Sequence, residues 1–206
     1  MAQKTIGIFG SYATRPGEAL YRLAYTIGHA LGTAGFAVLN GGYDGIMRAS
    51  SQGAWEAGAR TIGVTCPTVL RKRGAALRPN EFLVEIYEAP TLLTRIEAMM
   101  RACGGYVFLE GGTGTLSELG VIWEYVNKGF IRPRPIVLVG HYWADLAARI
   151  AAAREGADRH VLRVQSPETV VLMMSQHALG TRAALHLNRL AKRETPELLT
   201  TDSDSP

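Results

Sequence analysis

The stretch YVFLEGGTGTLSE, residues 106–118, decides the fold. It opens with Tyr106 to Leu109, a largely apolar run that is typical of a short buried strand. The glycine-rich turn Gly111–Thr115 follows directly, and the residues after it have the pattern of a helix that ends near Gly129. A strand that leads through a glycine turn into a helix is typical of a parallel sheet in an α/β protein.

The same alternation of short apolar strands and helices extends outward in both directions. The sequence predicts further strands at Thr5–Phe9, Phe36–Leu39, Thr61–Thr65, Phe82–Tyr87, Ile136–Val139 and Val161–Val164. It predicts helices from Pro16 to Gly35, from Gly45 to Gly58, at 91–102, at 142–154, from Ser166 and at 180–193, with a long loop at 66–80. We therefore expect one Rossmann-like α/β domain over residues 1–193, with a mostly parallel sheet and helices on both faces. The polar residues 194–206 are predicted to form a disordered tail.

Composition favours a globular protein with a small anionic ligand. The 206 residues are 47% hydrophobic and carry a net charge of +4. No apolar run reaches the roughly 18 residues that span a membrane, and we expect neither a secretory signal nor a membrane partner. We expect a cytoplasmic protein in which Cys66 and Cys103 are reduced, packed thiols without metal-ligand spacing. The compact basic cluster Arg71–Arg73 is expected in a solvated loop.

The turn Gly111–Thr115 has the features of a phosphate-binding loop. Glycines let a ligand approach the backbone, and the helix start presents free N–H groups and partial positive charge. Thr113 and Thr115 add hydroxyl groups. The turn lacks the lysine of the Walker pattern and the glycine spacing of the dinucleotide fingerprint. These residues alone leave open whether Gly111, Gly112, Thr113, Gly114 and Thr115 bind phosphate or form a plain tight turn.

Two charged residues near this turn have a structural and a functional interpretation. Thr115 and Glu118 have capping-box spacing, in which the glutamate bonds back to the first amide of the helix. Alternatively, Glu118 lies a ribose length from the phosphate, where it stabilises an oxocarbenium-like sugar and orients a water. Arg95 lies on the preceding helix, and a lone helical arginine is usually a solvated residue.

Two further glycine turns follow predicted strands, so a parallel sheet brings them to the same edge as residues 111–115. Gly10-Ser11 can donate to a ligand through its backbone and hydroxyl, and Gly41-Gly42 can cover the base or line the sugar. Equally, both serve as tight turns that allow close packing of helix on sheet. We take Gly10, Ser11, Gly41 and Gly42 as candidate substrate-binding residues.

These motifs resemble those of a known family. Residues 110–118 resemble the Pro-Gly-Gly-x-Gly-Thr-x-x-Glu motif of the LOG family of cytokinin-activating phosphoribohydrolases. Residues 40–47 resemble that family's Gly-Gly-Gly-x-x-Gly-Leu-Met segment. Arg95, fifteen residues before Glu110, occupies the position of the family's catalytic arginine. The resemblance runs from Ile6 to about Met174.

The resemblance implies a homodimer that hydrolyses the N-glycosidic bond of a nucleoside 5′-monophosphate, of the AMP or cytokinin riboside type. It implies that residues 112–115 hold the phosphate, that Glu118 contacts the ribose and supports the developing positive charge, and that Arg95 positions the sugar or that carboxylate. The products are the free base and ribose 5-phosphate, and neither a metal nor another cofactor is expected.

Four positions depart from the family pattern. Glu110 replaces a proline, Ile96 a lysine, and Asn40 and Arg48 each a glycine. Because Glu110 places negative charge beside an anion-binding loop, a non-catalytic nucleotide-binding or carrier protein of the same fold stays an alternative. Nucleic-acid binding is a weaker alternative, since the sequence shows no basic groove with interleaved aromatic residues.

Overall fold

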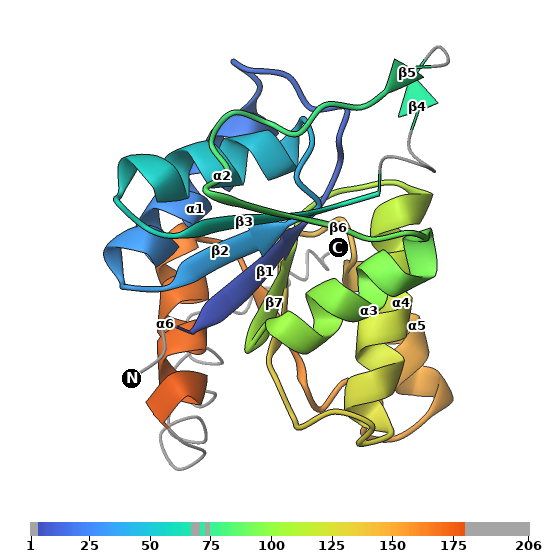
Figure 1. Cartoon of the computed structure of the whole chain (residues 1–206). Coiled ribbons are helices and arrows are strands. Elements are labelled where there is room, and N and C mark those ends of the chain that lie inside the picture. Colours follow the sequence, from blue (N-terminus) through green and yellow to red (C-terminus); the bar gives the residue numbers. More distant parts are fainter. Residues whose placement is uncertain (1–3, 67–70, 73–74, 180–206) are drawn as a thin grey trace, which may run out of the picture.

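The protein folds around one parallel sheet, as the sequence predicts (Figure 1). The computed structural model describes residues 4–66, 71–72 and 75–179. The sheet contains β1 (Thr5–Phe9), β2 (Ala37–Asn40), β3 (Thr61–Thr65), β6 (Glu85–Glu88), β7 (Gly105–Phe108), β8 (Ile136–Val139) and β9 (Val161–Val164). These strands lie in the order β6-β3-β2-β1-β7-β8-β9, and every neighbouring pair is parallel.

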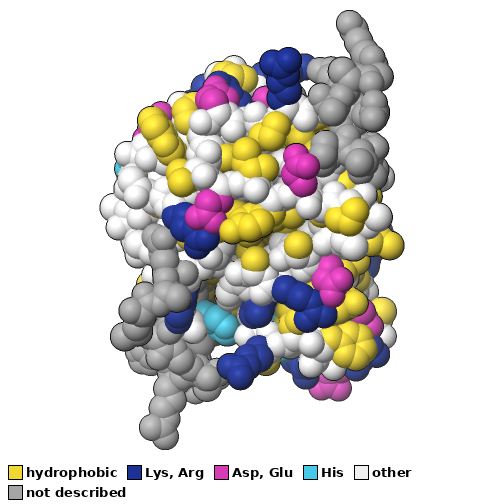
Figure 2. Space-filling view, viewed as in Figure 1, with side chains coloured by type: hydrophobic (Ala, Val, Ile, Leu, Met, Phe, Trp, Pro, Cys, Tyr) yellow, Lys and Arg dark blue, Asp and Glu magenta, His cyan; other side chains and the backbone are white. Residues whose placement is uncertain are grey.

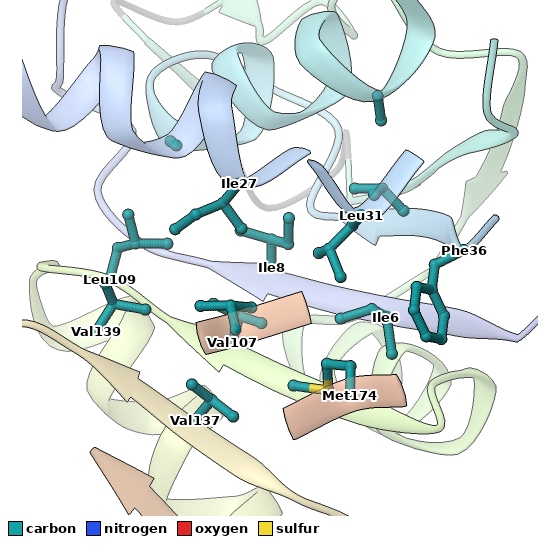
Figure 3. Close-up of a cluster of buried hydrophobic side chains, with 14 of the residues drawn as sticks. Ile6, Ile8, Ile27, Leu31, Phe36, Val107, Leu109, Val137, Val139 and Met174 are labelled. Atoms are coloured by element: carbon teal, nitrogen blue, oxygen red, sulfur yellow. The ribbon is translucent and has the colours of Figure 1, made fainter. Parts of the chain in front are cut away.

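Helices cover both faces of the sheet (Figure 1). One face carries α1 (Ala19–Thr33), α2 (Ile46–Glu56) and α6 (Pro167–Leu179), and the other carries α3 (Leu92–Ala102), α4 (Thr113–Asn127) and α5 (Ala144–Ala153). Figure 3 shows the first core, where Ile6 and Ile8 of β1 face Ile27 and Leu31 of α1. Residues that alternate along each strand contribute to opposite cores, as β1 does with Ile8 and Phe9. The predicted fold class is confirmed.

Three predicted segments differ most from the structure, whereas β2, β7 and the other helices have bounds within one or two residues of the predicted ones. α1 begins at Ala19 instead of Pro16, because Gly17 has a φ of +93° that a right-handed helix does not contain. The segment predicted as a loop at 66–80 contains the antiparallel pair β4 (Arg71–Lys72) and β5 (Ala75–Ala76), strands too short to show a hydrophobic period. β6 begins three residues later than expected, since the amide of Phe82 donates to Asn80 Oδ1 in a turn (3.2 Å). The predictions for Arg73, for 180–193 and for 194–206 lie outside the described residues.

Both cysteines are free and buried, in agreement with the predicted packed thiols. Burial raises the pKa of the Cys103 thiol to about 12, which leaves it in the unreactive protonated form at neutral pH. In the part of the chain that the structure describes, no helix combines the length and the apolar character needed to cross a bilayer.

The strand order identifies one crevice of the sheet as the candidate ligand site. β1 lies at the centre of the sheet, with β2 on one side and β7 on the other, so the direction of the connections reverses between β1 and β7. In such sheets the crevice beyond the carboxyl ends of the strands at this point is the usual ligand site. The loops after Phe9 and Phe108 both lead into that crevice.

Candidate functional site

Backbone hydrogen bonds join the loops that follow β1, β2 and β7. The Ser11 amide donates to the Glu110 carbonyl, and the Ser11 carbonyl accepts from the Ile46 amide, both at 2.9 Å. Gly45, with a φ of +68°, allows this contact, because a Cβ there would lie 2.3 Å from the Ser11 carbonyl oxygen. The predicted convergence of the three glycine turns is therefore observed.

All four carbonyl groups of residues 109–112 are occupied by the protein itself. The donors are Trp143 Nε1 to Leu109 (2.9 Å), the Ser11 amide to Glu110 (2.9 Å), the Tyr142 hydroxyl to Gly111 (2.9 Å) and the Leu116 amide to Gly112 (3.0 Å). Because its carbonyls are used, the loop offers a ligand its N–H groups. Sequence reasoning missed Tyr142 and Trp143, which belong to the start of another helix and carry no motif.

The first turn of α4 presents unsatisfied amides. Within the described chain the N–H groups of Thr113, Gly114 and Thr115 have no acceptor, as expected for the start of a helix. A Cβ at Gly112 or Gly114 would meet nothing within 4 Å, so packing does not require glycine at either position. The open space over these amides, together with the positive end of the helix dipole, suits an oxyanion such as phosphate.

The capping-box interpretation of Thr115 and Glu118 is wrong. α4 begins at Thr113 with Gly112 as its N-cap, so Thr115 lies inside the first turn. The Thr115 side chain is buried against Gly111, where a Cβ would lie 2.2 Å from its Oγ1. The carboxylate of Glu118 is bonded to a residue of α3 instead of the start of its own helix.

That partner is Arg95, which is buried and not solvated as expected for a lone helical arginine. Its Nη1 donates to Glu118 Oε1 at 3.2 Å, and its Nε donates to the Val64 carbonyl of β3 at 2.7 Å. The guanidinium carbon lies 5.9 Å from the centroid of the Tyr43 ring. The two side chains of the pair are 6% and 11% exposed, so α3, α4 and β3 together fix their positions.

The turn after β2 packs against the guanidinium group of Arg95. A Cβ at Gly41 would lie 1.7 Å from Arg95 Nη2, so glycine is required for the guanidinium to occupy its place. The Gly42 amide donates to Asn40 Oδ1 (2.8 Å), and its carbonyl accepts from the Asn80 amide (2.9 Å). Gly41 thus contacts the candidate catalytic arginine, whereas ligand contacts by Gly41 and Gly42 stay a prediction.

Three of the departures from the family pattern have a structural explanation. The side-chain Nδ2 of Asn40 donates to the Met47 carbonyl (2.9 Å) and to Ser51 Oγ (2.8 Å), which ties the turn to α2. Arg48 pairs with Glu81 on the surface. Ile96 is buried in the core between the sheet and α3. The Arg95–Glu118 ion pair is present together with these substitutions.

The carboxyl group of Glu118 titrates in an unusual range. Burial raises its pKa to about 7, while the charge and the hydrogen bond of Arg95 oppose that rise. Oε2 accepts no hydrogen bond in the described chain and is not fully buried. At a rise of about 1.5 Å per residue, Glu118 lies about 6 Å along the helix axis from Gly114. The site therefore places a carboxyl group that titrates near neutral pH one helical turn from the open amides at the start of α4.

The chain matches a known family and known folds. The model of the SLOG cluster4 family matches residues 3–171. The chain is 29% identical over 150 residues to the pyrimidine/purine nucleotide 5′-monophosphate nucleosidase of Escherichia coli (strain K12). The aligned part is 68% of this chain but 31% of that protein, so the chain spans about a third of the length of this curated relative. The family-level prediction made from the LOG-type motifs is confirmed.

Solved structures show the same fold. The molybdenum cofactor carrier protein of Chlamydomonas reinhardtii superposes with a TM-score of 0.69 at 21% identity, over 87% of this chain and 100% of that chain. The molybdenum cofactor binding protein of Rippkaea orientalis superposes with a TM-score of 0.67 at 21% identity, over 85% of this chain and 97% of that chain. At these identities the likeness establishes the arrangement of strands and helices.

Proposed function

The chain belongs to the SLOG cluster4 family, and from this premise we propose that it hydrolyses the N-glycosidic bond of a nucleoside 5′-monophosphate. AMP and cytokinin riboside monophosphates are the candidate substrates, and the products are the free base and ribose 5-phosphate. One observation carries the proposal. A buried carboxyl group with a pKa raised to about 7, that of Glu118, lies one helical turn from the free amides of α4.

The phosphate of the substrate binds to the amides of residues 113–115, and the ribose lies along the first turn of α4 with Oε2 of Glu118 toward it. When the C1′–N bond breaks, its electron pair leaves with the base and the sugar becomes oxocarbenium-like. The ionised carboxylate stabilises that charge. A water then adds to C1′, and Glu118 accepts the proton that the water loses. This proton passes through solvent to the nitrogen of the departed base, which gives the neutral free base and restores the carboxylate. A pKa near 7 suits both steps at neutral pH.

Arg95 has a positioning role in this scheme. Its bond to Oε1 fixes the carboxylate and leaves Oε2 for the substrate. Its positive charge also lowers the pKa of Glu118 against the effect of burial, which keeps part of the population ionised. The E. coli nucleosidase, which shares 29% identity over the aligned 150 residues, supports the same class of reaction.

The direct test is to incubate the protein with a panel of nucleoside 5′-monophosphates and to measure free base by chromatography. Glu118→Gln removes the ionisable group, and we expect it to lower base release by at least a hundred-fold while nucleotide binding persists. Glu124→Gln is the matched control, because Glu124 lies on the same helix with a side chain that is 56% exposed. Equal turnover by wild type and Glu118→Gln would contradict the proposal.

A non-catalytic nucleotide-binding or carrier protein is the second candidate function. The observation that favours it is the closed ion pair, which leaves the Arg95 and Glu118 side chains 6% and 11% exposed. The same fold occurs in a protein named as a cofactor carrier, so the fold alone does not require catalysis. Thermal stabilisation by a monophosphate without any base release would support this candidate.

The proposal includes a homodimer, as the family resemblance implies, and a small nucleotide as the ligand in preference to nucleic acid. On the face shown in Figure 2, basic side chains are separated by acidic, apolar and uncharged atoms and do not join in one band. Sedimentation velocity measures the oligomeric state. Steeply salt-dependent binding of single-stranded DNA would argue against the small-ligand preference.

A further inference from the structure

An open cavity of about 370 Å³ lies beside the loop that presents the amides. Gly111 and Gly112 form one border, and the chain from Ser11 to Thr14 and the start of α1 form another. Its volume lies in the range of small-ligand pockets, about 300 to 1,000 Å³. Arg95 and Glu118 lie between α3 and α4, on the sheet face opposite α1. The loop therefore has a carboxylate side and a cavity side.

Thr14 has an unused polar group in this cavity. The residue is 7% exposed and lines the cavity, yet its side chain has no hydrogen-bond partner in the described chain. Its hydroxyl is not among the fully enclosed atoms without a partner, so it keeps contact with solvent. Because no protein group occupies it, a hydroxyl group of a ligand in the cavity can bond to Thr14 in place of solvent.

Two carboxylates face the same space. Glu18 occupies the N-cap position of α1 but makes no side-chain cap hydrogen bond, although it lines the cavity. Glu110, at the position where the family has proline, lines the cavity beside Gly111. Ionised carboxylates only accept hydrogen bonds, and none of the described residues lining the cavity is a lysine or arginine. The cavity therefore repels a second phosphate and favours a neutral group rich in hydroxyl donors.

We propose that this cavity is a subsite for a hydroxyl-bearing group esterified to the outer oxygen of the 5′-phosphate. The ligands then include nucleoside 5′-phosphodiesters that carry a sugar or another polyol, alongside the free monophosphates of the proposed function. The inference rests on the proposed function for the position of the phosphate. The phosphate binds at the start of α4, its ribose extends toward Glu118, and its ester group extends toward Thr14 and Glu18.

The test compares AMP, its methyl ester and its glyceryl ester. The two esters carry the same charge and differ in hydroxyl groups. Binding is measured by calorimetry on the Glu118→Gln variant, which removes turnover. We expect the glyceryl ester to bind about ten-fold more tightly than the methyl ester, as two added hydrogen bonds would give. The double variant Thr14→Val, Glu18→Gln, made in the same background, should erase this difference and leave AMP binding unchanged.

Equal affinities for the two esters, or an equal loss for all three ligands in the double variant, would overturn the subsite. If Thr14→Val proves unstable, the single variant Glu18→Gln, at an exposed residue, takes the place of the double variant. It should remove a large part of the difference in affinity between the glyceryl and methyl esters. Failure of the proposed function is a separate result. In that case wild type releases base from none of the three compounds, while the glyceryl preference in binding is still measurable.

Discussion

At the scale of the residue, the proposed hydrolysis assigns the pH dependence of activity to the Arg95–Glu118 pair. The pKa of Glu118 is raised to about 7 by burial, and Arg95 works against that rise. If the ionised carboxylate is the active form, kcat/KM of the wild type should increase with pH and level off above about pH 7. A profile without an inflection between pH 6 and 8 would contradict the assignment of Glu118.

Removing the arginine should move this inflection upward. In Arg95→Met the opposing positive charge is lost, so burial acts alone and the pKa of Glu118 rises further. We expect the limb of the kcat/KM profile to shift to higher pH and activity at pH 7 to fall at least ten-fold. Arg101→Met is the matched control, because Arg101 lies on the same helix and pairs on the surface with Glu97 (2.8 Å). A profile of Arg95→Met that overlays the control would show that Arg95 does not act on Glu118.

The sequence identified both members of this pair only through the family motif. From the residues alone, Glu118 fits a capping box and Arg95 fits a solvated helix surface, and the structure shows neither. Spacing along one helix does not reveal a bond between α3 and α4, which forms because β3 and the turn at Gly41 bring them together. The place of Thr14 in the wall of the cavity likewise depends on tertiary packing and leaves no mark in the sequence.

At the scale of the element, substitutions at two glycines of α4 can distinguish an effect on helix stability from an effect on ligand binding. Gly114 and Gly120 lie on the same helix, and a Cβ at either position would meet nothing within 4 Å. Alanine at either position should therefore stabilise the helix by up to about 1 kcal/mol. In a helix the Cβ tilts toward the N-terminus, so only the methyl of Gly114→Ala projects toward a ligand at the first turn.

We expect Gly114→Ala to raise the Kd for AMP at least ten-fold while its Tm stays at or above that of the wild type. Gly120→Ala should show the same or a higher Tm with unchanged affinity. Calorimetric titration and thermal unfolding of both variants measure the two effects. If Gly114→Ala binds AMP as tightly as Gly120→Ala does, the phosphate does not lie at this helix start.

The accuracy at three buried strands and the error at β6 have the same physical cause, which is the degree of burial. β1, β3, β8 and β9 have the predicted bounds, and the first three are almost entirely buried apolar runs between turn residues. β6 lies at the edge of the sheet and is mostly exposed, so its sequence EIYE lacks a hydrophobic period and its position was predicted poorly. The glycine turns after β1, β2 and β7 were located correctly because glycine marks them.

At the scale of the whole molecule, the order of elements made the parallel sheet predictable, whereas the contents of the crevice were not. Alternating strands and helices imply a parallel sheet with ligand loops at one edge. The cavity beside Gly111 depends on where α1 begins and on how Tyr142 reaches across to the loop (2.9 Å to the Gly111 carbonyl). Both features follow from packing between segments that are distant in the sequence.

The raised pKa of Glu118 also links function to global stability. In the folded protein this group holds its proton more tightly than in the unfolded chain, where its pKa is near the usual 4.5. The stabilisation that protonation of Glu118 gives to the folded protein is therefore fully present below about pH 4.5 and is lost as the pH rises through about 7. The difference between these pKa values corresponds to a penalty on the order of 3 kcal/mol in the wild type above pH 7.

Glu118→Gln does not titrate, so the variant escapes this penalty. We expect its Tm relative to wild type to increase by roughly 5 to 10 °C between pH 5 and pH 8, as a change of this size implies for a chain of this length. The variant also leaves Arg95 without its carboxylate partner. This loss shifts the Tm by a similar amount at every pH, so it does not produce the change of the Tm difference with pH. Glu124→Gln, at an exposed position on the same helix, should show a flat difference over this range. A flat difference for Glu118→Gln as well would show that its pKa is not raised in the folded state, and the general-base role of Glu118 would lose its physical basis.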